Sequence, residues 1–220
     1  MDYKRLTLIC GHYGSGKTNV AVNLAFDLKR QYNKTSIADL DIVNPYFRTK
    51  DSTEELEKAG IELICSDYAG TNVDIPALPQ QMYSITDDRS KKVILDIGGD
   101  DRGALALGRL APAILDENDY EMLMVINRFR PLTRDARSTV EVMREIEYAG
   151  GIPFTGLVNN SNLGEETTAE DILSSVAYAN EVSELSSLPV KFTSVHDTVY
   201  AAVAGKINNL FPLKLQPKIG

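Results

Sequence analysis

Three segments of different character follow one another near the start of the chain. An apolar run from Arg5 to Cys10 leads directly into the glycine-rich segment Gly11–Thr18 (G-H-Y-G-S-G-K-T). A stretch with helical periodicity then runs from Lys17 to Arg30, with its apolar residues on one stripe. A strand, a tight loop and a helix in immediate succession favour an α/β fold built from strand–helix–strand units.

The remainder of the chain repeats this alternation. Six further apolar runs bounded by turn residues predict strands, at Thr35–Leu40, Ile61–Ile64, Lys92–Ile97, Glu121–Asn127, Ile152–Asn159 and Val190–Thr193. Helical periodicity predicts helices at Arg134–Ala149 and after Thr167–Glu170, which has capping-box spacing. The first and fourth strands are almost continuously apolar, as in strands covered on both faces. We therefore expect one domain over residues 1–220, with a mostly parallel sheet between helices.

The segment Gly11–Thr18 fits the phosphate-binding pattern G-x-x-x-x-G-K-[ST] at every fixed position. Its glycines allow positive φ angles, so that successive amide N–H groups can point into one anion-binding nest. Lys17 would reach the β and γ phosphates, and the Thr18 hydroxyl would bind Mg²⁺. The predicted nucleotide contacts in this region are Gly11, Tyr13, Gly14, Ser15, Gly16, Lys17, Thr18 and Asn19.

Carboxylates end two of the predicted strands. Asp96 ends Lys92–Ile97, where a Walker-B aspartate would hold Mg²⁺, and D-x-x-G places the Gly99 amide where it could sense a γ phosphate. Asp39 and Asp41 end the second strand and point to one side. Either alone could be an ordinary strand-end acid or a helix cap. Their position on the edge that carries the glycine-rich loop favours a functional role for these carboxylates over both alternatives.

The run Ser36–Asp41 (S-I-A-D-L-D), in which Asp41 lies 24 residues after Lys17, resembles the second-strand motif of the CobQ/CobB/MinD/ParA group of P-loop ATPases. Leu40–Thr49 and the glycine-rich loop resemble a bacterial subgroup labelled only as ATP-binding. The resemblance implies seven or eight strands between helices and Mg²⁺ held by residues matching Thr18 and Asp39 or Asp96. It also implies that Asp41 orients the attacking water, which makes Lys17 and Asp41 the predicted catalytic residues.

Two further features concern the nucleotide base. Gly156–Ser161 (G-L-V-N-N-S) resembles the segment that places an asparagine against adenine in the nitrogenase iron protein, and Asn160 is the predicted contact. The alternative is a polar residue that closes a strand. Asn127–Arg130 (N-R-F-R) does not match the N-K-x-D pattern by which many GTPases read guanine, which favours ATP over GTP.

The chain departs from the group at His12, where most members carry a signature lysine that reaches the nucleotide of a partner subunit. Histidine, with an ordinary pKa of about 6.5, is mostly neutral at pH 7 and replaces that charge poorly. A homodimer therefore stays possible but is not required. The candidate substitutes are arginines, Arg48, Arg128, Arg130, Arg134 and Arg137. For any single one, the alternative is a solvated arginine that pairs with a neighbouring acid.

Charge and hydropathy restrict the partners. The chain has 23 basic and 31 acidic residues, a formal net charge of -8 that opposes binding to DNA or anionic lipid. No apolar run approaches the roughly 18 residues of a membrane span, and the first ten residues lack the features of a secretory signal. We expect a cytoplasmic protein without stable membrane association, whose protein partner or small-molecule substrate is unknown.

Three functions fit these features. The first is a switch with slow Mg²⁺-dependent ATPase activity, in which the γ phosphate orders the segments after Asp41 and Asp96 and hydrolysis releases a partner. The second is a small-molecule ligase or kinase resembling dethiobiotin synthetase, with the irregular stretch Thr71–Gln80 as part of an acceptor site. The third is a nucleotide-gated adaptor that scarcely hydrolyses. The first explains both aspartate motifs and is the preferred interpretation.

Overall fold

The computed structural model describes residues 2–40, 52–65, 80–99 and 101–215. Its eight strands form one sheet in the order β3-β2-β4-β1-β5-β6-β7-β8, and every neighbouring pair is parallel. The strands are β1 Leu6–Cys10, β2 Thr35–Leu40, β3 Glu62–Ile64, β4 Lys92–Ile97, β5 Tyr120–Ile126, β6 Gly156–Asn159, β7 Val190–His196 and β8 Leu210–Leu213.

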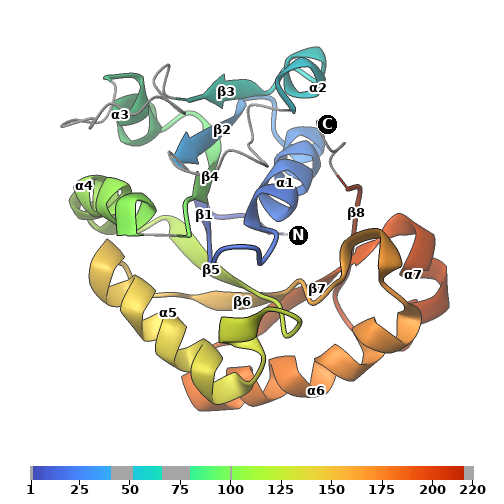
Figure 1. Ribbon diagram of the computed structural model, residues 1–220. Helices are drawn as coiled ribbons and strands as arrows, with labels where there is room; N and C mark the ends of the chain where they lie inside the picture. Colours follow the sequence, from blue (N-terminus) through green and yellow to red (C-terminus); the bar gives the residue numbers. More distant parts are fainter. Residues whose placement is uncertain (1, 41–51, 66–79, 100, 216–220) are drawn as a thin grey trace.

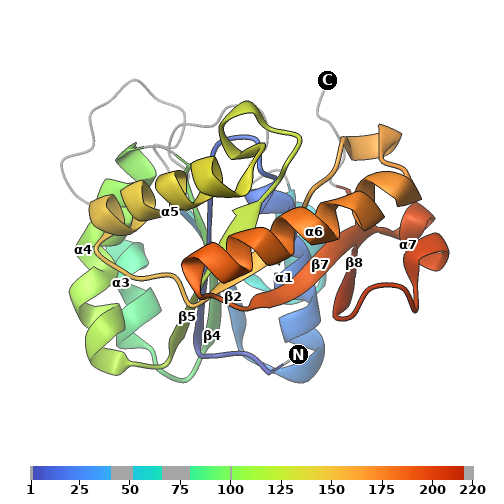
Figure 2. The ribbon, with the colours of Figure 1, turned by 90° about the horizontal axis from the view of Figure 1, so that it is seen from below.

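Helices cover both faces of this sheet (Figure 1). They are α1 Lys17–Gln31, α2 Thr53–Lys58, α3 Gln80–Asp87, α4 Asp101–Glu117, α5 Ala136–Gly150, α6 Ala169–Ser186 and α7 Asp197–Val203. One core cluster joins α3, α4, α5 and α6 to one face, and a second joins α1 and α2 to the other. Figure 2 shows α5 and α6 side by side across the first face. The α/β class and the three-layer arrangement are thus confirmed.

The two faces can be read from the strands residue by residue. In β2 and β4, Ile37 and Ile94 pack in the cluster with α1, whereas Ala38 and Leu95 pack in the cluster with α4 and α5. Successive side chains of a strand alternate between faces, so where both faces are apolar, as at Val93–Leu95 of β4, the strand contains a continuous apolar run. This explains why β1 and β4 could be predicted with correct or nearly correct bounds.

Other bounds differ from those expected. The predicted strand Ile152–Asn159 begins only at Gly156, because Ile152 and Phe154 are buried in the preceding connection rather than in the sheet. The capping box lies one residue later than predicted: Thr168 is the N-cap, and its partner is Asp171. Strand β8 was not predicted. It has four residues including Pro212, lies at the sheet edge where proline is tolerated, and gives little sequence signal.

The sheet order places β1 in the interior, between β4 and β5. From β5 onward the strands continue outward on one side, and β2 and β3 lie beyond β4 on the other. Ligands of open parallel sheets bind beyond the carboxyl ends of the strands at such a reversal of direction. The loop that follows β1 therefore occupies the position where this fold forms its binding site. Among the described helices, none is both long enough and apolar enough to cross a bilayer.

Candidate nucleotide-binding site

The loop between β1 and α1 leaves amide groups available for an anion. Gly14 and Gly16 have φ angles of 76° and 88°, in the left-handed region that favours glycine. The first intrahelical bond of α1 runs from the Val20 N–H to the Gly16 carbonyl, at 3.1 Å. The amides of the first helical turn therefore lack intrahelical acceptors, and the first turn has no acidic side chain to compete for them. This is the arrangement in which a helix N-terminus binds phosphate.

Lys17 is the clearest electrostatic feature of this loop. Its side chain is only 5% exposed, and it has no hydrogen-bond acceptor or counter-ion among the described residues. A Cβ atom on Gly99 would lie 2.8 Å from the Lys17 Nζ, and equally close to the Gly11 carbonyl and the Tyr13 amide. The backbone after β4 thus lies directly against the loop and its lysine. A buried ammonium is costly unless an anion accompanies it, so the site fits a phosphate group.

Asp39 and Asp96 are opposite each other in the parallel pair β2 and β4. They alternate with residues of the α4–α5 face and therefore point to the face covered by α1, the helix on which Thr18 lies. Both carboxylates are buried, at 7% and 0% exposure. The Thr18 hydroxyl makes no hydrogen bond to another described residue. Two adjacent carboxylates and a hydroxyl are the oxygen donors that Mg²⁺ prefers, so this set fits the cation.

Asn160 follows β6 and reaches the loop from across the sheet. Its Nδ2 donates to the Ser15 carbonyl at 2.7 Å, and its Oδ1 accepts from the Ser194 hydroxyl at 2.5 Å. The side chain is 3% exposed, and a Cβ atom on Gly16 would collide with it. The structure therefore brings Asn160 to the loop, and its contact with adenine stays a prediction. Ser194 had no local sequence signal, because its partner lies 34 residues away.

The four candidate arginines in the described part of the chain do not form one group. Arg137 is exposed in the first turn of α5. Arg130 donates from Nε to the Gly14 carbonyl at 2.7 Å. Arg128 instead donates to the Ser174 carbonyl on α6, and Arg134 lies 3.8 Å from the carboxylate of Asp135. Arg134 is thus a solvated arginine paired with a neighbouring acid, whereas Arg130 contacts the loop after β1.

The other predicted residues divide into two sets. His12 is partly buried, and its Nδ1 lies 3.0 Å from the Tyr13 carbonyl of the same loop. The Tyr13 side chain is exposed, and Asn19 lies in the first turn of α1. Asp41, Arg48 and residues 71–79 lie outside the described part of the chain.

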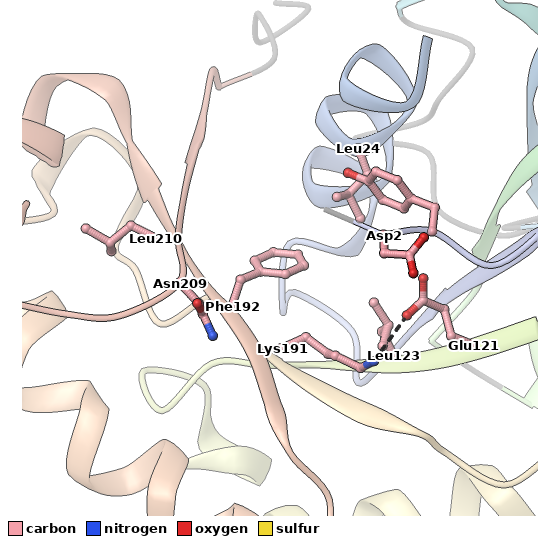
Figure 3. A pocket seen from close by; sticks show the side chains of 9 residues that line it. Asp2, Leu24, Glu121, Leu123, Lys191, Phe192, Asn209 and Leu210 are labelled. Carbon is pink, nitrogen blue, oxygen red and sulfur yellow. Dashed lines mark ion pairs between the residues drawn. The ribbon is translucent and has the colours of Figure 1, made fainter. Parts of the chain in front are cut away.

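A distinct cavity of about 360 Å³ opens at the other end of the strands, near the amino ends of β5 and β7 (Figure 3). Leu24, Leu123 and Phe192 form an apolar wall, and the Lys191–Glu121 ion pair at 3.6 Å lies at its rim. Because the loop after β1 lies at the carboxyl ends of the strands, this cavity is not part of the phosphate site.

Comparison with known proteins agrees with this geometry. The model of the CobQ/CobB/MinD/ParA nucleotide-binding domain matches residues 7–185. The chain belongs to this family. Its membership confirms the resemblance to this group and supports nucleotide binding as the function of the domain. No curated protein matches the chain.

Several solved structures similar to this family member are FtsY and signal recognition particle proteins. Cell division protein FtsY from Thermotoga maritima has a TM-score of 0.56 at 17% identity, over 86% of this chain and 61% of that one. Chloroplast FtsY from Physcomitrella patens gives 0.56 at 19%, over 88% and 59%. The signal recognition particle 54 kDa protein from Aeropyrum pernix, in complex with GDP, gives 0.55 at 18%, over 87% and 41%. The chain spans less than two thirds of each, and at this identity the likeness concerns the fold alone.

Proposed function

We propose that the chain binds ATP with Mg²⁺ at residues 11–18 and hydrolyses it slowly, as a nucleotide-dependent switch. The observation that carries the proposal is the buried ammonium of Lys17, which has no counter-ion among the described residues and lies at the open N-terminus of α1. Membership of the nucleotide-binding family supports it. An anion with several charges is the ligand that this combination of ammonium, amides and helix dipole would bind most tightly.

The residues have separate roles in this proposal. Lys17 and the loop amides stabilise negative charge on the leaving phosphates, and Asp41 positions the attacking water. Thr18, Asp39 and Asp96 would hold Mg²⁺, which when bound neutralises charge on the β and γ phosphates. No side chain forms a covalent bond to the substrate, so the rate enhancement comes from placement and from electrostatic stabilisation.

The asparagine after β5 supports ATP over GTP. Asn127 is 1% exposed, its Oδ1 accepts from the Phe129 amide at 3.0 Å and its Nδ2 donates to the Asn162 carbonyl at 3.2 Å. Its side chain thus stabilises the local turn, and no aspartate follows at the position that would read guanine. One fold neighbour was solved with GDP, so competition between ATP and GTP for the same site is the direct test.

The switch would act through Gly99. This residue lies against both the loop and Lys17, and it is in the connection between β4 and α4. Binding or loss of a γ phosphate would therefore shift the backbone at the start of α4. A partner or a second copy bound there would respond to the nucleotide state. Size-exclusion chromatography compares the size of the protein in ADP with its size in a non-hydrolysable ATP analogue. An assembly that forms in only one of the two is nucleotide-gated, and one that forms in both is constitutive.

The experiment that tests the proposal measures nucleotide affinity and phosphate release for the wild type and for Lys17→Ala. We expect Mg²⁺-dependent binding and slow turnover in the wild type and loss of both in the variant. Lys29→Ala is the matched control, because Lys29 lies in the last turn of the same helix and donates to the Asn33 carbonyl. Unchanged turnover in Lys17→Ala, or a wild type that binds no nucleotide, would overturn the proposal.

A further inference from the structure

Two consecutive carbonyls of the loop are each held by a side chain from another part of the fold. The Gly14 carbonyl accepts from Arg130 Nε, and the Ser15 carbonyl accepts from Asn160 Nδ2, both at 2.7 Å. These donors are 116 and 145 residues from their acceptors in the sequence, one after β5 and the other after β6. The middle of the loop is thus fixed by residues that belong to neither β1 nor α1.

Holding a carbonyl also sets the direction of the amide beside it. A trans peptide group is planar, and its C=O and N–H bonds point in opposite directions. The Gly14–Ser15 peptide directs the Ser15 amide to the His12 carbonyl, at 3.1 Å. The Ser15–Gly16 peptide directs the Gly16 amide away from Asn160, and this amide has no acceptor among the described residues. It is therefore available to a phosphate oxygen.

Asn160 is itself held in one orientation. A carbonyl can only accept, so the side-chain nitrogen must face Ser15, and the side-chain oxygen then accepts from the Ser194 hydroxyl on β7. Burial of the side chain keeps water from competing for either bond. Ser194 thus acts on the loop through Asn160.

We propose that Arg130 and Asn160, with Ser194 behind Asn160, are positioning residues of the loop. Asn160 orients the Ser15–Gly16 peptide so that the Gly16 amide can bind phosphate, and Arg130 holds the preceding Gly14–Ser15 peptide, whose amide closes the turn onto the His12 carbonyl. We call these three residues the clamp. The clamp rests on the proposed function and deepens it, because it names the residues that orient the loop amides in the nucleotide-free protein. The three residues act on the loop alone, and none of them needs to contact the base or the attacking water. The clamp predicts that its loss weakens every ligand that carries the phosphate chain, with or without a base.

The chain contains a matched control for Asn160 and Ser194. Asn159 donates from Nδ2 to the Ser175 hydroxyl at 2.9 Å, and both residues are fully buried, but this pair joins β6 to α6 and does not contact the loop. Alanine substitution of Asn159 or Ser175 therefore removes a bond of the same chemistry from the same region. A purely structural role for Asn160 predicts equal effects in the two pairs.

The test measures the affinity of each variant for Mg²⁺-ATP and for Mg²⁺ with inorganic triphosphate, and its thermal midpoint. We expect Asn160→Ala to weaken both ligands about tenfold, the factor that one lost hydrogen bond produces. Ser194→Ala should weaken them about threefold, and adding it to Asn160→Ala should cost no more. The control variants lower the midpoint but change affinity less than twofold. Equal affinity losses in the two pairs, or a loss for ATP alone, would overturn the clamp.

Arg130 has its own control in Arg128, which lies two residues away and donates to α6 instead. Arg130→Ala should weaken inorganic triphosphate about tenfold and Arg128→Ala less than twofold. Arg130→Lys keeps the charge but loses the planar donor that holds Gly14, so we expect only partial recovery. Full recovery by lysine would show that charge rather than orientation matters, which contradicts the role given to Arg130.

One measurement separates failure of the clamp from failure of the proposed function. In nucleotide-free protein labelled with ¹⁵N, the Gly16 amide resonance reports the orientation of its peptide group. We expect it to move in Asn160→Ala and to stay in place in Ser175→Ala. A resonance that is unchanged in Asn160→Ala refutes the clamp even if nucleotide binds. A wild type that binds no nucleotide refutes the proposed function, whatever this resonance does.

Discussion

Replacing Gly99 with alanine tests the close approach between the backbone after β4 and the loop after β1. The added Cβ would lie 2.8 Å from the Gly11 carbonyl, the Tyr13 amide and the Lys17 Nζ. These separations are about 0.7 Å shorter than the roughly 3.5 Å of unstrained contact. The Gly99 backbone is outside the left-handed region, so alanine adds no φ strain and the whole effect is steric.

The magnitude follows from which atoms must move. Two of the three neighbours are backbone atoms of a loop with fixed dihedral angles, and only Lys17 Nζ is the end of a flexible side chain. Overpacking of this kind costs about 1–3 kcal/mol. If the loop moves aside to relieve it, the same free energy appears as about 5- to 150-fold weaker binding of Mg²⁺-ATP. If the loop stays in place, it appears as a lower free energy of unfolding.

The assay therefore measures both quantities, affinity by nucleotide titration and stability by urea unfolding. Gly108→Ala is the control, because its Cβ would meet only the Ala149 carbonyl, at 3.8 Å, in the middle of α4. Alanine there should leave affinity unchanged and stabilise the helix by up to about 1 kcal/mol. Wild-type affinity together with wild-type stability in Gly99→Ala would refute the placement of Gly99 against the loop.

Two further predictions concern stability. The buried ion pair of Arg5 and Glu117 has both side chains 6% exposed, so Glu117→Gln should lose about 3–5 kcal/mol in urea unfolding, whereas the exposed Glu54→Gln should lose less than about 0.5 kcal/mol; similar losses would contradict the prediction. The hydrogen bond from Lys91 holds the pKa of Glu62 below its usual value, so its stabilisation is present above the unfolded-state pKa and is lost as pH falls through the folded-state pKa. As pH is lowered from about 6 through the folded-state pKa, which lies below the ordinary 4.5, stability should consequently fall more in the wild type than in Glu62→Gln, and parallel pH profiles would show that this carboxylate contributes nothing.

The parts that the sequence determined by itself are those with a local physical cause. Only glycine takes the left-handed angles of Gly14 and Gly16 without cost, so a loop that needs these angles can be recognised from the spacing of its glycines. Strands covered on both faces are almost continuously apolar, which made β1 and β4 recognisable. Because parallel strands share one carboxyl edge, Asp39 and Asp96 could be placed together before any coordinates, and their register in β2 and β4 agrees.

The tertiary structure decided what depends on neighbours distant in the chain. Four arginines in Arg128–Arg137 look alike in the sequence, and only the packing of the connection after β5 against the loop selects Arg130. The sequence likewise placed Asn160 at the site without showing that it holds the Ser15 carbonyl, since the acceptor is 145 residues away. Local dihedral preferences and periodicity depend only on each residue and its near neighbours in the sequence. The partner of a buried hydrogen bond is chosen by the fold as a whole, because burial makes an unpaired donor costly and the fold determines which acceptor is within reach.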